Sequence, residues 1–132
     1  LAGFYSLQDI GEHCILLVRL AFAYCSALTS VTIPNSVTSI GEDAFYGCSS
    51  LTSVTINSDA IVSKDYSYDD NISDIFGSQV TEYIIGESVT SIGSSAFRNC
   101  SSLTSVTIGE SVTSIGYRAF EDCSKLTSVT IG

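Results

Sequence analysis

The chain has 132 residues, of which 45% are hydrophobic and 14% charged, and its formal net charge is −9. This length suits one domain, and the composition provides enough apolar residues for a buried core, which argues against disorder. The chain has 14 acidic and only 5 basic residues, so nucleic acid and anionic membrane surfaces are not expected as partners. Basic proteins remain possible partners.

The N-terminal part carries no recognisable targeting signal. The most apolar run, Cys14–Tyr24, is interrupted by Arg19 and is shorter than the roughly 18 residues that a membrane span needs, so no membrane insertion is expected. No cluster of basic residues precedes it, so it does not resemble a signal sequence. The chain begins with Leu1 and not with methionine, which suggests a processed or excised piece of a longer protein.

Residues 1–20 are the least regular part of the chain. The stretch Leu7–Glu12 is similar to Val37–Glu42, but the next Ala-Phe pair then starts seven residues later than the repeat would place it. We expect these extra residues near Cys14–Leu20 and predict a short helix over Glu12–Leu20. Because the end units of stacked repeats lack one neighbour, we interpret residues 1–20 as an irregular first unit or an N-terminal cap.

From residue 21 onward one short unit is repeated. The pair Ala-Phe occurs at residues 21–22, 44–45, 96–97 and 119–120, and a cysteine follows three residues after each phenylalanine. The starts are separated by 23, 52 and 23 residues, and 52 equals 29 plus 23. Copies of one short unit bury their apolar faces against each other, so the chain is predicted to be a repeat solenoid.

One unit is hidden in the middle of the chain. The segment Gly77–Gly93 aligns with Cys100–Gly116, so Gly77 takes the place of the cysteine, and Phe76 is expected to supply the ring. Six surplus residues then fall within Asn57–Ile72. We interpret residues 57–72 as a loop inserted at one edge of the solenoid.

Each unit is expected to contain two extended segments and one turn of helix. The pattern Leu-x-x-Val-x-Ile, with β-branched residues in alternation, predicts a short strand. A second extended segment is predicted at Val37–Ile40 and at its copies, residues 89–92 and 112–115, each followed by a glycine where the chain turns tightly. Between that glycine and the cysteine there is room for one helical turn, such as Glu42–Tyr46.

The pattern AFxxCSSLTSVTIPxSVTSIGxxAFxxC resembles the BspA-like leucine-rich repeat family, found on surface and secreted proteins of bacteria and some protists. The resemblance covers residues 21–132. It implies an α/β repeat solenoid, a right-handed leucine-rich-repeat superhelix of short parallel strands and one-turn helices that is mostly β and coil. It also implies an extracellular or cell-surface location and adhesion to proteins of a host or a neighbouring cell.

Stacking at about 4.8 Å turns each repeated residue into a column along the solenoid. The rings expected to stack in the core are Phe22, Phe45, Phe76, Phe97 and Phe120. The cysteines also recur on neighbouring units, Cys25 with Cys48 and Cys100 with Cys123. Disulfides and a column of small buried thiols are the two alternatives, and the parallel direction of side chains in a ladder favours thiols.

The residues on either side of the central strand position point away from the core and are the first candidates for binding. They form the columns Ser30, Ser53, Glu82, Ser105, Ser128 and Thr32, Thr55, Ile84, Thr107, Thr130. Glu82, Tyr83 and Ile84 interrupt this hydroxyl lattice in the variant unit. The outward Ile84 either marks a contact with a partner or packs under the inserted loop. The regular hydroxyl lattice either binds a partner or only keeps the protein soluble.

The inserted loop is acidic and contains tyrosines. Its candidate binding residues are Asp65, Tyr66, Tyr68, Asp69 and Asp70. Tyrosines among acidic residues suit a protein interface, and a solvated acidic loop is the alternative. Calcium is a further alternative because carboxylates gather here, but the spacing Asp-x-Asp-x-Asp-Gly does not occur, so neither a metal nor a cofactor is predicted.

Three functions remain open for this sequence. The first is a non-enzymatic binding or adhesion module that engages a protein of unknown identity through the hydroxyl face and the loop. The second is a passive spacer or scaffold within a longer repeat protein, and the third is a glycan-binding repeat surface. No nucleophile, base and orienting group occur as a set, so no enzyme is predicted. The strand pattern of Leu126–Ile131, directly before the last residue, predicts either a longer natural chain or end-to-end self-association.

Overall fold

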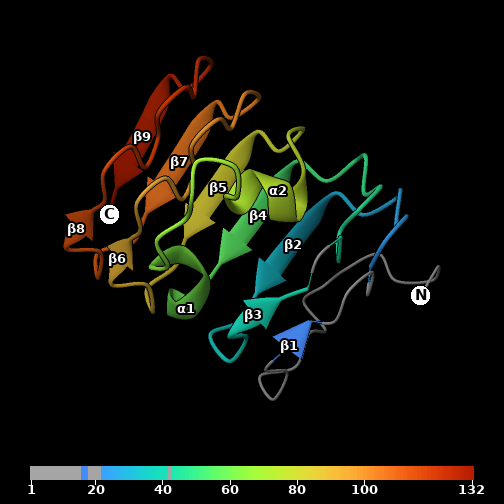
Figure 1. Ribbon diagram of the computed structural model, residues 1–132, viewed down its shortest axis with the longest axis horizontal. Helices are drawn as coiled ribbons and strands as arrows, with labels where there is room; N and C mark the ends of the chain where they lie inside the picture. The colour runs from blue at the N-terminus through green and yellow to red at the C-terminus, as the bar shows by residue number, and fades with distance from the viewer. Residues whose placement is uncertain (1–15, 18–21, 42) are drawn as a thin grey trace.

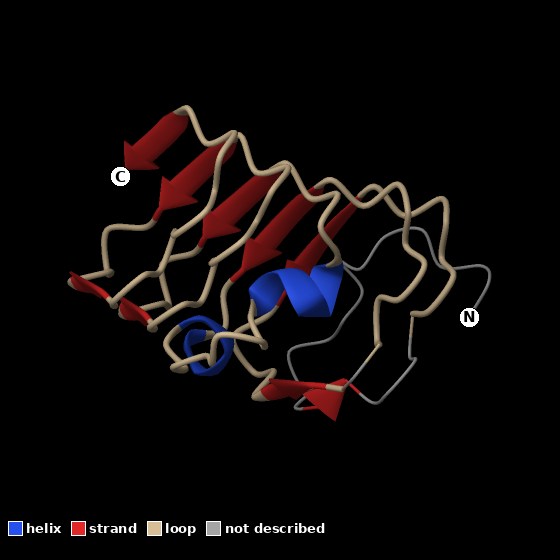
Figure 2. Ribbon diagram, turned by 45° about the horizontal axis from the view of Figure 1, so that its top comes forward, coloured by secondary structure: helices blue, strands red, loops and turns tan. Residues whose placement is uncertain are grey.

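The computed structural model describes residues 16–17, 22–41 and 43–132, and it stacks their repeat units as a solenoid (Figures 1 and 2). A parallel sheet along one side has the strand order β2-β4-β5-β7-β9. Its strands are β2 (Ser30–Ile33), β4 (Ser53–Ile56), β5 (Glu82–Ile85), β7 (Ser105–Ile108) and β9 (Ser128–Ile131). Each strand pairs with that of the next unit along the chain, which confirms the predicted solenoid.

The register of this sheet follows the repeat without a slip. Corresponding residues pair along the whole sheet in the order Ser30, Ser53, Glu82, Ser105 and Ser128. Within β4 the side chains of Val54 and Ile56 are fully buried, whereas Thr55 between them is partly exposed. Because successive side chains of a strand point to opposite faces, the valine and isoleucine positions fill the core and the hydroxyl positions face outward.

Short strands form a second set of ladders on the other side of the solenoid. β1 (Leu16–Leu17) pairs in parallel with β3 (Ser39–Ile40), and β6 (Ser91–Ile92) pairs with β8 (Ser114–Ile115). The glycine after β8 serves close packing: a Cβ atom on Gly116 would lie 2.5 Å from the backbone nitrogen of Ser94. Glycine is therefore needed there because neighbouring units approach each other closely.

The predicted helical turn is absent before the described cysteines, whereas the variant unit has a short helix, Ile72–Phe76, directly before Gly77. Residues 43–47 form turns, with φ 58° at Asp43 and 76° at Gly47. Left-handed residues occupy the equivalent places in later units, at Ser95, Asn99, Arg118 and Asp122. A right-handed helix does not continue through a left-handed residue, so the prediction of a helical turn over Glu42–Tyr46 was wrong for residues 43–46, and Glu42 lies outside the described residues.

The inserted segment contains one short helix and ends at Ile72, where a second short helix begins, so it is not a plain loop. α1 (Asp59–Val62) contacts β3 and β6 and lies between them, so it divides the second ladder into two pairs (Figure 1). The Ser58 hydroxyl donates to the carbonyl of Val37 on one side. On the other side the Gly93 amide donates to the carbonyl of Val62 at 2.9 Å. α1 therefore replaces the missing strand and hydrogen-bonds to both neighbouring units.

α2 (Ile72–Phe76) begins at a capping box. The Asn71 side chain accepts a hydrogen bond from the Ser73 amide, and the Asp74 carboxylate accepts one from the Asn71 amide. Such reciprocal bonds satisfy amides that a helix start leaves open, which explains how a five-residue helix is held. No helix in the described part of the chain is long and apolar enough to cross a membrane.

The first described strand corrects the interpretation of the N-terminal residues. Leu16 pairs with Ser39, 23 residues later, which is the spacing of the regular units. Leu16 and Leu17 therefore take the place that the sequence comparison assigned to Asp9–Ile10, and residues 16–17 are strand where a helix over Glu12–Leu20 was predicted. The rest of that helix, and the interpretation of residues 1–15 as part of a first unit or cap, lie outside the described residues.

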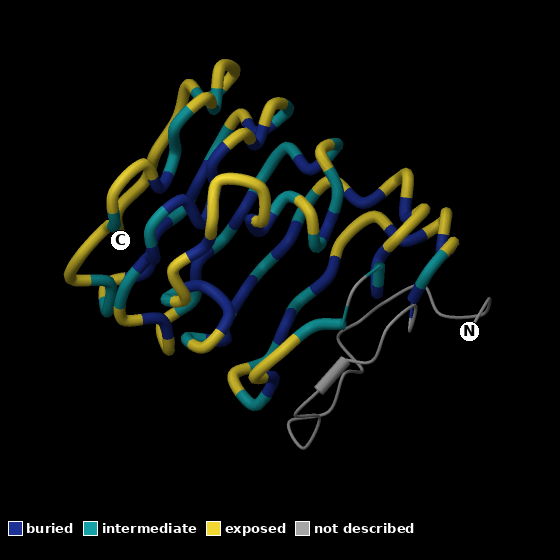
Figure 3. Tube along the Cα trace, in the orientation of Figure 1, coloured by how far each residue is buried: buried dark blue, intermediate teal, exposed yellow. Residues whose placement is uncertain are grey.

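One aromatic column runs through the core. From the N-terminal end it consists of Phe22, Phe45, Phe76, Tyr83, Phe97 and Phe120. Neighbouring ring centroids lie 4.9–6.3 Å apart, which is within the range of favourable aromatic contacts. The predicted column is confirmed, including Phe76, and the ring of Tyr83 is inserted in it. Figure 3 shows the buried segments running through the middle units while the turns are exposed.

No disulfide joins the described cysteines to each other. Cys25, Cys48 and Cys100 are buried, and Cys123 is half-buried. The Cys48 thiol donates to the carbonyl of Phe22 in the preceding unit at 3.1 Å, and Cys123 bonds equivalently to the unit before it. Burial raises the pKa of the Cys48 thiol, which keeps it protonated. The predicted column of thiols, and not the disulfide alternative, is thus confirmed for these residues.

Candidate binding surfaces

The outer face of the main sheet carries the two predicted columns. All ten positions lie on the strands, and each is partly or fully exposed. Ser128 and Thr130 are on the outer strand β9 and are exposed, as is Ser30 at the other end. The side chains therefore form a flat, mostly hydroxyl surface, as expected from the repeat. End-to-end self-association through β9 stays a prediction.

A third column, which consists of threonines and which the sequence reasoning missed, borders this face. The Thr81 hydroxyl donates to the Thr52 carbonyl at 3.2 Å, and Thr104 donates to Thr81 at 3.1 Å. Thr127 continues the series with a bond of 3.4 Å to Thr104. These hydroxyls are already engaged with the preceding unit, so this column ties units together. Its signal in the sequence was the threonine that follows the leucine of most units.

The variant unit changes the chemistry of the outer face at β5. The Ser53 hydroxyl donates to the Glu82 carboxylate at 2.9 Å, so the glutamate lies along the serine column. Ile84 pairs with Thr55 on one side and Thr107 on the other. It places one apolar side chain in the middle of the hydroxyl surface, as the sequence predicted.

Tyr83 does not belong to this surface, although it was a candidate binding residue. Its side chain is 0% exposed and lies in the aromatic column between Phe76 and Phe97. The alternation of the strand explains the error, because Tyr83 occupies the inward valine position. Its hydroxyl has no hydrogen-bond partner within the described residues, and burial raises its pKa well above the usual value.

The candidates of the inserted segment also divide into buried and exposed residues. Tyr66 is buried, and its hydroxyl donates to the carbonyl of Ile61 at 2.6 Å, so it anchors the segment instead of meeting a partner. The Asp65 carboxylate accepts a hydrogen bond from the Ser94 amide at 2.9 Å, which again is a structural contact. Asp69 and Asp70 are exposed.

Tyr68 is 64% exposed and covers a buried arginine. The Arg98 guanidinium lies 3.7 Å from the centroid of the Tyr68 ring and donates to the Tyr68 carbonyl at 3.2 Å. The same guanidinium donates to Glu121 at 2.8 Å and to Asp122 at 3.4 Å. These bonds raise the pKa of Arg98, with the hydrogen bond to Glu121 as the largest cause. The cluster fastens the inserted segment to the two units that follow it.

The hydroxyl face and the inserted segment do not form one site. Phe76 of α2 contacts the Tyr83 ring, which points to the core side of β5, whereas Ile84 points to the other side. Figure 2 shows both helices on the side of the main sheet that faces the other strands. The inserted segment is thus on the far side of the solenoid, and Ile84 does not pack under it.

The acidic residues of the inserted segment are not arranged as ligands of an ion. Among residues 16–17, 22–41 and 43–132, no group of three or more His, Cys, Asp or Glu residues has a geometry that could hold a metal. Asp65 and Asp74 are instead engaged with backbone amides. The calcium alternative therefore gains no support from the described residues.

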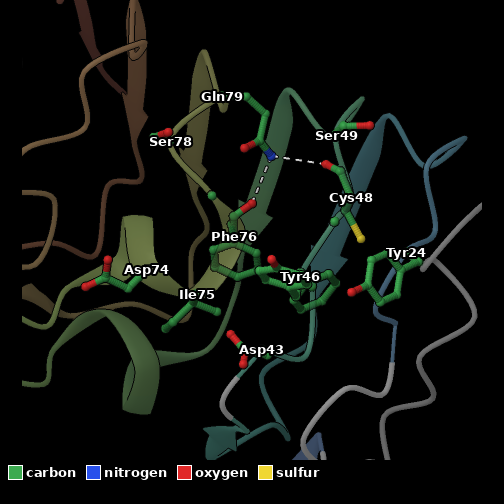
Figure 4. A pocket seen from close by; sticks show the side chains of 13 residues that line it. Tyr24, Asp43, Tyr46, Cys48, Ser49, Asp74, Ile75, Phe76, Ser78 and Gln79 are labelled. Atoms are coloured by element: carbon green, nitrogen blue, oxygen red, sulfur yellow. Dashed lines mark hydrogen bonds between the residues drawn. The ribbon is translucent and has the colours of Figure 1, made fainter.

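A pocket that the sequence reasoning missed lies beside α2 (Figure 4). Its volume is about 480 Å³, and its lining includes the side chains of Tyr24, Asp43, Tyr46, Asp74 and Gln79. The available signal was the pair of tyrosines at the variable positions between phenylalanine and cysteine in the first two regular units. The role of these tyrosines could not be recognised from the sequence because Asp74 and Gln79, which line the same pocket, come from a distant part of the chain.

The pocket forms where the cysteine column is interrupted. Gly77 has φ 102°, a backbone conformation that favours glycine, and its missing side chain leaves room for Gln79. The Gln79 amide nitrogen donates to the carbonyls of Cys48 at 3.2 Å and Leu51 at 3.1 Å. In this unit the glutamine, and not a thiol, thus bonds to the preceding unit, at other carbonyls than the phenylalanine carbonyl that the thiols of Cys48 and Cys123 use.

Comparison with known proteins identifies the repeat. A family model described as "BspA type Leucine rich repeat region (6 copies)" matches residues 73–132. Proteins of this kind are generally non-enzymatic binding modules that mediate protein interactions. No curated protein matches the chain.

Three crystal structures resemble the fold. The leucine rich repeat protein of T. pallidum has 31% sequence identity and a TM-score of 0.54; the alignment covers 87% of this chain and 51% of that one. This chain therefore spans about half the length of that relative. A leucine rich cell surface protein from Faecalibacterium prausnitzii A2-165 has 30% identity, a TM-score of 0.41 and coverages of 91% and 34%. A leucine-rich repeat protein from Bacteroides ovatus ATCC 8483 has 22% identity, a TM-score of 0.35 and coverages of 94% and 48%.

Proposed function

Because this chain belongs to the BspA-type leucine-rich repeat family, we propose that it is a non-enzymatic module that binds another protein. The proposed binding surface is the outer face of the main sheet, centred on β5. The proposed location is the cell surface or a secreted protein, an inference drawn from the family.

The single observation that carries this proposal is the isoleucine in the hydroxyl lattice. Ile84 lies between Thr55 and Thr107, and the neighbouring Glu82 supplies a carboxylate in the same unit. Ile84 is partly exposed on a face that points away from the core, and an interface would bury the part of its side chain that folding leaves exposed. Full burial of an exposed isoleucine side chain is worth about 1.5–3 kcal/mol, and an interface would gain the share of it that belongs to the exposed part of Ile84.

The test is to restore the regular lattice with Ile84→Thr, which gives β5 the residue of its neighbours. The immobilised chain is incubated with extracts of cell-surface proteins, and the retained proteins are quantified by mass spectrometry. We expect Ile84→Thr to lose a retained partner by about tenfold or more, since 1.4 kcal/mol corresponds to a factor of ten.

The matched control is Ile115→Thr, the same substitution at an isoleucine that is 51% exposed in β8. It should retain the partner, and thermal unfolding should show that both variants are folded. Equal retention by the wild type and Ile84→Thr would refute the proposed surface. If no protein is retained in a saturable way, the alternative of a passive spacer or scaffold is favoured instead.

Glycan binding on the hydroxyl face remains a weaker alternative. The face offers hydroxyls on every main-sheet strand except β5, but the one aromatic residue of the described strands, Tyr83, is buried and provides no platform for a sugar ring. We therefore rank protein binding first on this surface.

A further inference from the structure

We propose that the pocket beside α2 receives the arginine side chain of a partner protein. This inference rests on the proposed protein-binding function but concerns a second surface, on the turn side of the solenoid and away from Ile84. The ligand group is a guanidinium that enters between tyrosine rings and carboxylates.

The pocket combines exposed aromatic rings with acidic groups. Tyr24 is 71% exposed and Tyr46 56% exposed, and their rings meet edge to face with centroids 5.6 Å apart. Asp43 and Asp74 line the same pocket, and in Figure 4 Asp43 lies beside Tyr46, whereas Asp74 lies beyond Ile75 with its carboxylate turned away from the rings. None of the described residues that line it is a lysine or an arginine. Aromatic faces and carboxylates together are the groups that attract a guanidinium.

The molecule itself shows how this chemistry holds an arginine. Arg98 occupies the position after phenylalanine that Tyr46 occupies in its own unit. Its guanidinium lies 3.7 Å from the Tyr68 ring centroid and binds the carboxylates of Glu121 and Asp122 at 2.8 and 3.4 Å. The pocket beside α2 offers the same components, tyrosine rings and two carboxylates, without a cation from its own described lining.

The charge around the pocket also favours a cation. A neighbouring pocket of about 610 Å³ shares Asp43 and Asp74 and adds Asp69 and Asp70 against the single Lys64. The whole chain carries a formal charge of −9. Such a field attracts cationic segments and speeds their encounter, and it disfavours phosphate-bearing ligands.

Gly47 makes the aromatic wall of the pocket possible. It has φ 76°, and a Cβ atom there would lie 2.7 Å from Cδ1 of Tyr24. The Tyr24 ring therefore packs directly over the backbone of the next unit and is held in place beside Tyr46. A wall that is already ordered spends less of the binding energy on immobilising side chains.

The test is an NMR titration with an acetylated, amidated tetra-arginine peptide. The matched ligand is tetra-citrulline, which has the same shape but no charge. We expect saturable shifts of the Gly47, Ser78 and Gln79 amide signals with tetra-arginine, and at least tenfold weaker binding of tetra-citrulline. Equal binding of the two peptides, or shifts spread over the whole acidic surface, would overturn the proposal.

Two variants remove the proposed contacts without removing structural bonds. Asp43→Asn keeps a residue that tolerates the left-handed backbone at this position, and Tyr46→Ala removes an exposed ring. Each should weaken tetra-arginine binding by about three- to thirtyfold, the range of a cation–aromatic or charge contact. Asp74 is left unchanged because it caps α2.

The control variants carry the same changes elsewhere. Tyr117→Ala removes a ring that is 73% exposed, and Glu110→Gln removes an exposed carboxylate. Both should bind tetra-arginine like the wild type; losses equal to those of the pocket variants would refute the pocket. Binding of a neutral cello-oligosaccharide at the same signals, with none for tetra-arginine, would assign the pocket to glycans and overturn the proposal.

The two proposals fail separately. Ile84→Thr should leave the tetra-arginine titration unchanged, because Ile84 is not among the residues that line the pocket. A chain that binds tetra-arginine in the pocket but retains its partners equally with and without Ile84 refutes only the sheet surface. A chain whose partner retention depends on Ile84 but whose pocket ignores tetra-arginine refutes only the inference made here.

Discussion

The two long sides of the solenoid respond differently to the same insertion. On the main sheet, β4 and β5 remain in register although 29 residues, not 23, separate Ser53 from Glu82. On the other side the ladder is broken: β3 pairs with β1, β6 pairs with β8, and α1 occupies the place between them. The sheet side thus preserves the repeat, and the turn side absorbs the irregularity.

The difference shows which side of the solenoid depends on the regular repeat for its stability. On the sheet side every inward residue has equivalents on the next units, and a one-residue slip would turn the whole set outward. On the turn side, groups of the inserted segment form hydrogen bonds with backbone amides and carbonyls of the neighbouring units. The Thr90 amide donates to the Asp59 carboxylate at 2.7 Å, and the Ile72 amide donates to the Ala96 carbonyl at 2.9 Å. New features, including the pocket, arise where such local replacements occur.

The largest expected effect is on the aromatic column that supports the sheet side. Phe97→Ala should lower the free energy of unfolding by about 3–5 kcal/mol, because units on both sides hold the resulting cavity open. Phe97 is 0% exposed and contacts Tyr83 and Phe120. Urea denaturation followed by circular dichroism measures the change. The partly buried end ring is the control, and Phe120→Ala should cost less. An unchanged stability of Phe97→Ala would remove the basis of the comparison.

A smaller effect on stability, of opposite sign, is expected for a substitution of Tyr83, whose ring lies in the core. Tyr83→Phe should raise the free energy of unfolding by about 1 kcal/mol, because the buried Tyr83 hydroxyl has no partner. The matched change Tyr66→Phe should lower it by a similar amount, because the Tyr66 hydroxyl donates to Ile61. Destabilisation by both changes would contradict the description of the Tyr83 environment.

The pH dependence of stability provides a second comparison between the wild type and Tyr83→Phe. Burial raises the pKa of Tyr83 well above its ordinary value of 10.0. Its neutral form is therefore favoured in the folded state, so its contribution to stability is present below pH 10 and is lost as the pH rises above 10. Tyr83→Phe lacks this group, so its advantage over the wild type should grow above pH 10. A constant difference between the two chains would contradict the raised pKa.

The smallest expected effect on global stability concerns the fastening of the inserted segment. Arg98→Leu removes the bonds to Glu121 and Asp122 and the contact with the Tyr68 ring. Trypsin should then cleave after Lys64 severalfold faster, while the main sheet keeps its protection in hydrogen exchange. The control Arg118→Leu removes an exposed arginine and should leave cleavage unchanged. Loss of protection throughout the main sheet would show that the two sides are not independent.

Several details of the fold could be predicted because they repeat. The strands, their outward hydroxyl columns, the thiol column and the role of Phe76 all followed from residues at constant spacing. The predictions that failed concern backbone conformation and single copies. The left-handed residues that exclude a helix at Asp43 have no signature in apolar spacing, and the burial of Tyr66 depends on where the inserted segment folds back.

The sequence by itself determined the solenoid, its register and the isoleucine on the sheet face, because stacking makes every repeated position a column with one direction. Only the tertiary structure decided which side of the solenoid the insertion occupies. It placed Tyr83 in the core, Tyr68 over Arg98, and Asp74 in the lining of the pocket that the tyrosines of earlier units form. The physical reason is that these residues occur once, so their surroundings depend on contacts between distant segments and not on periodicity.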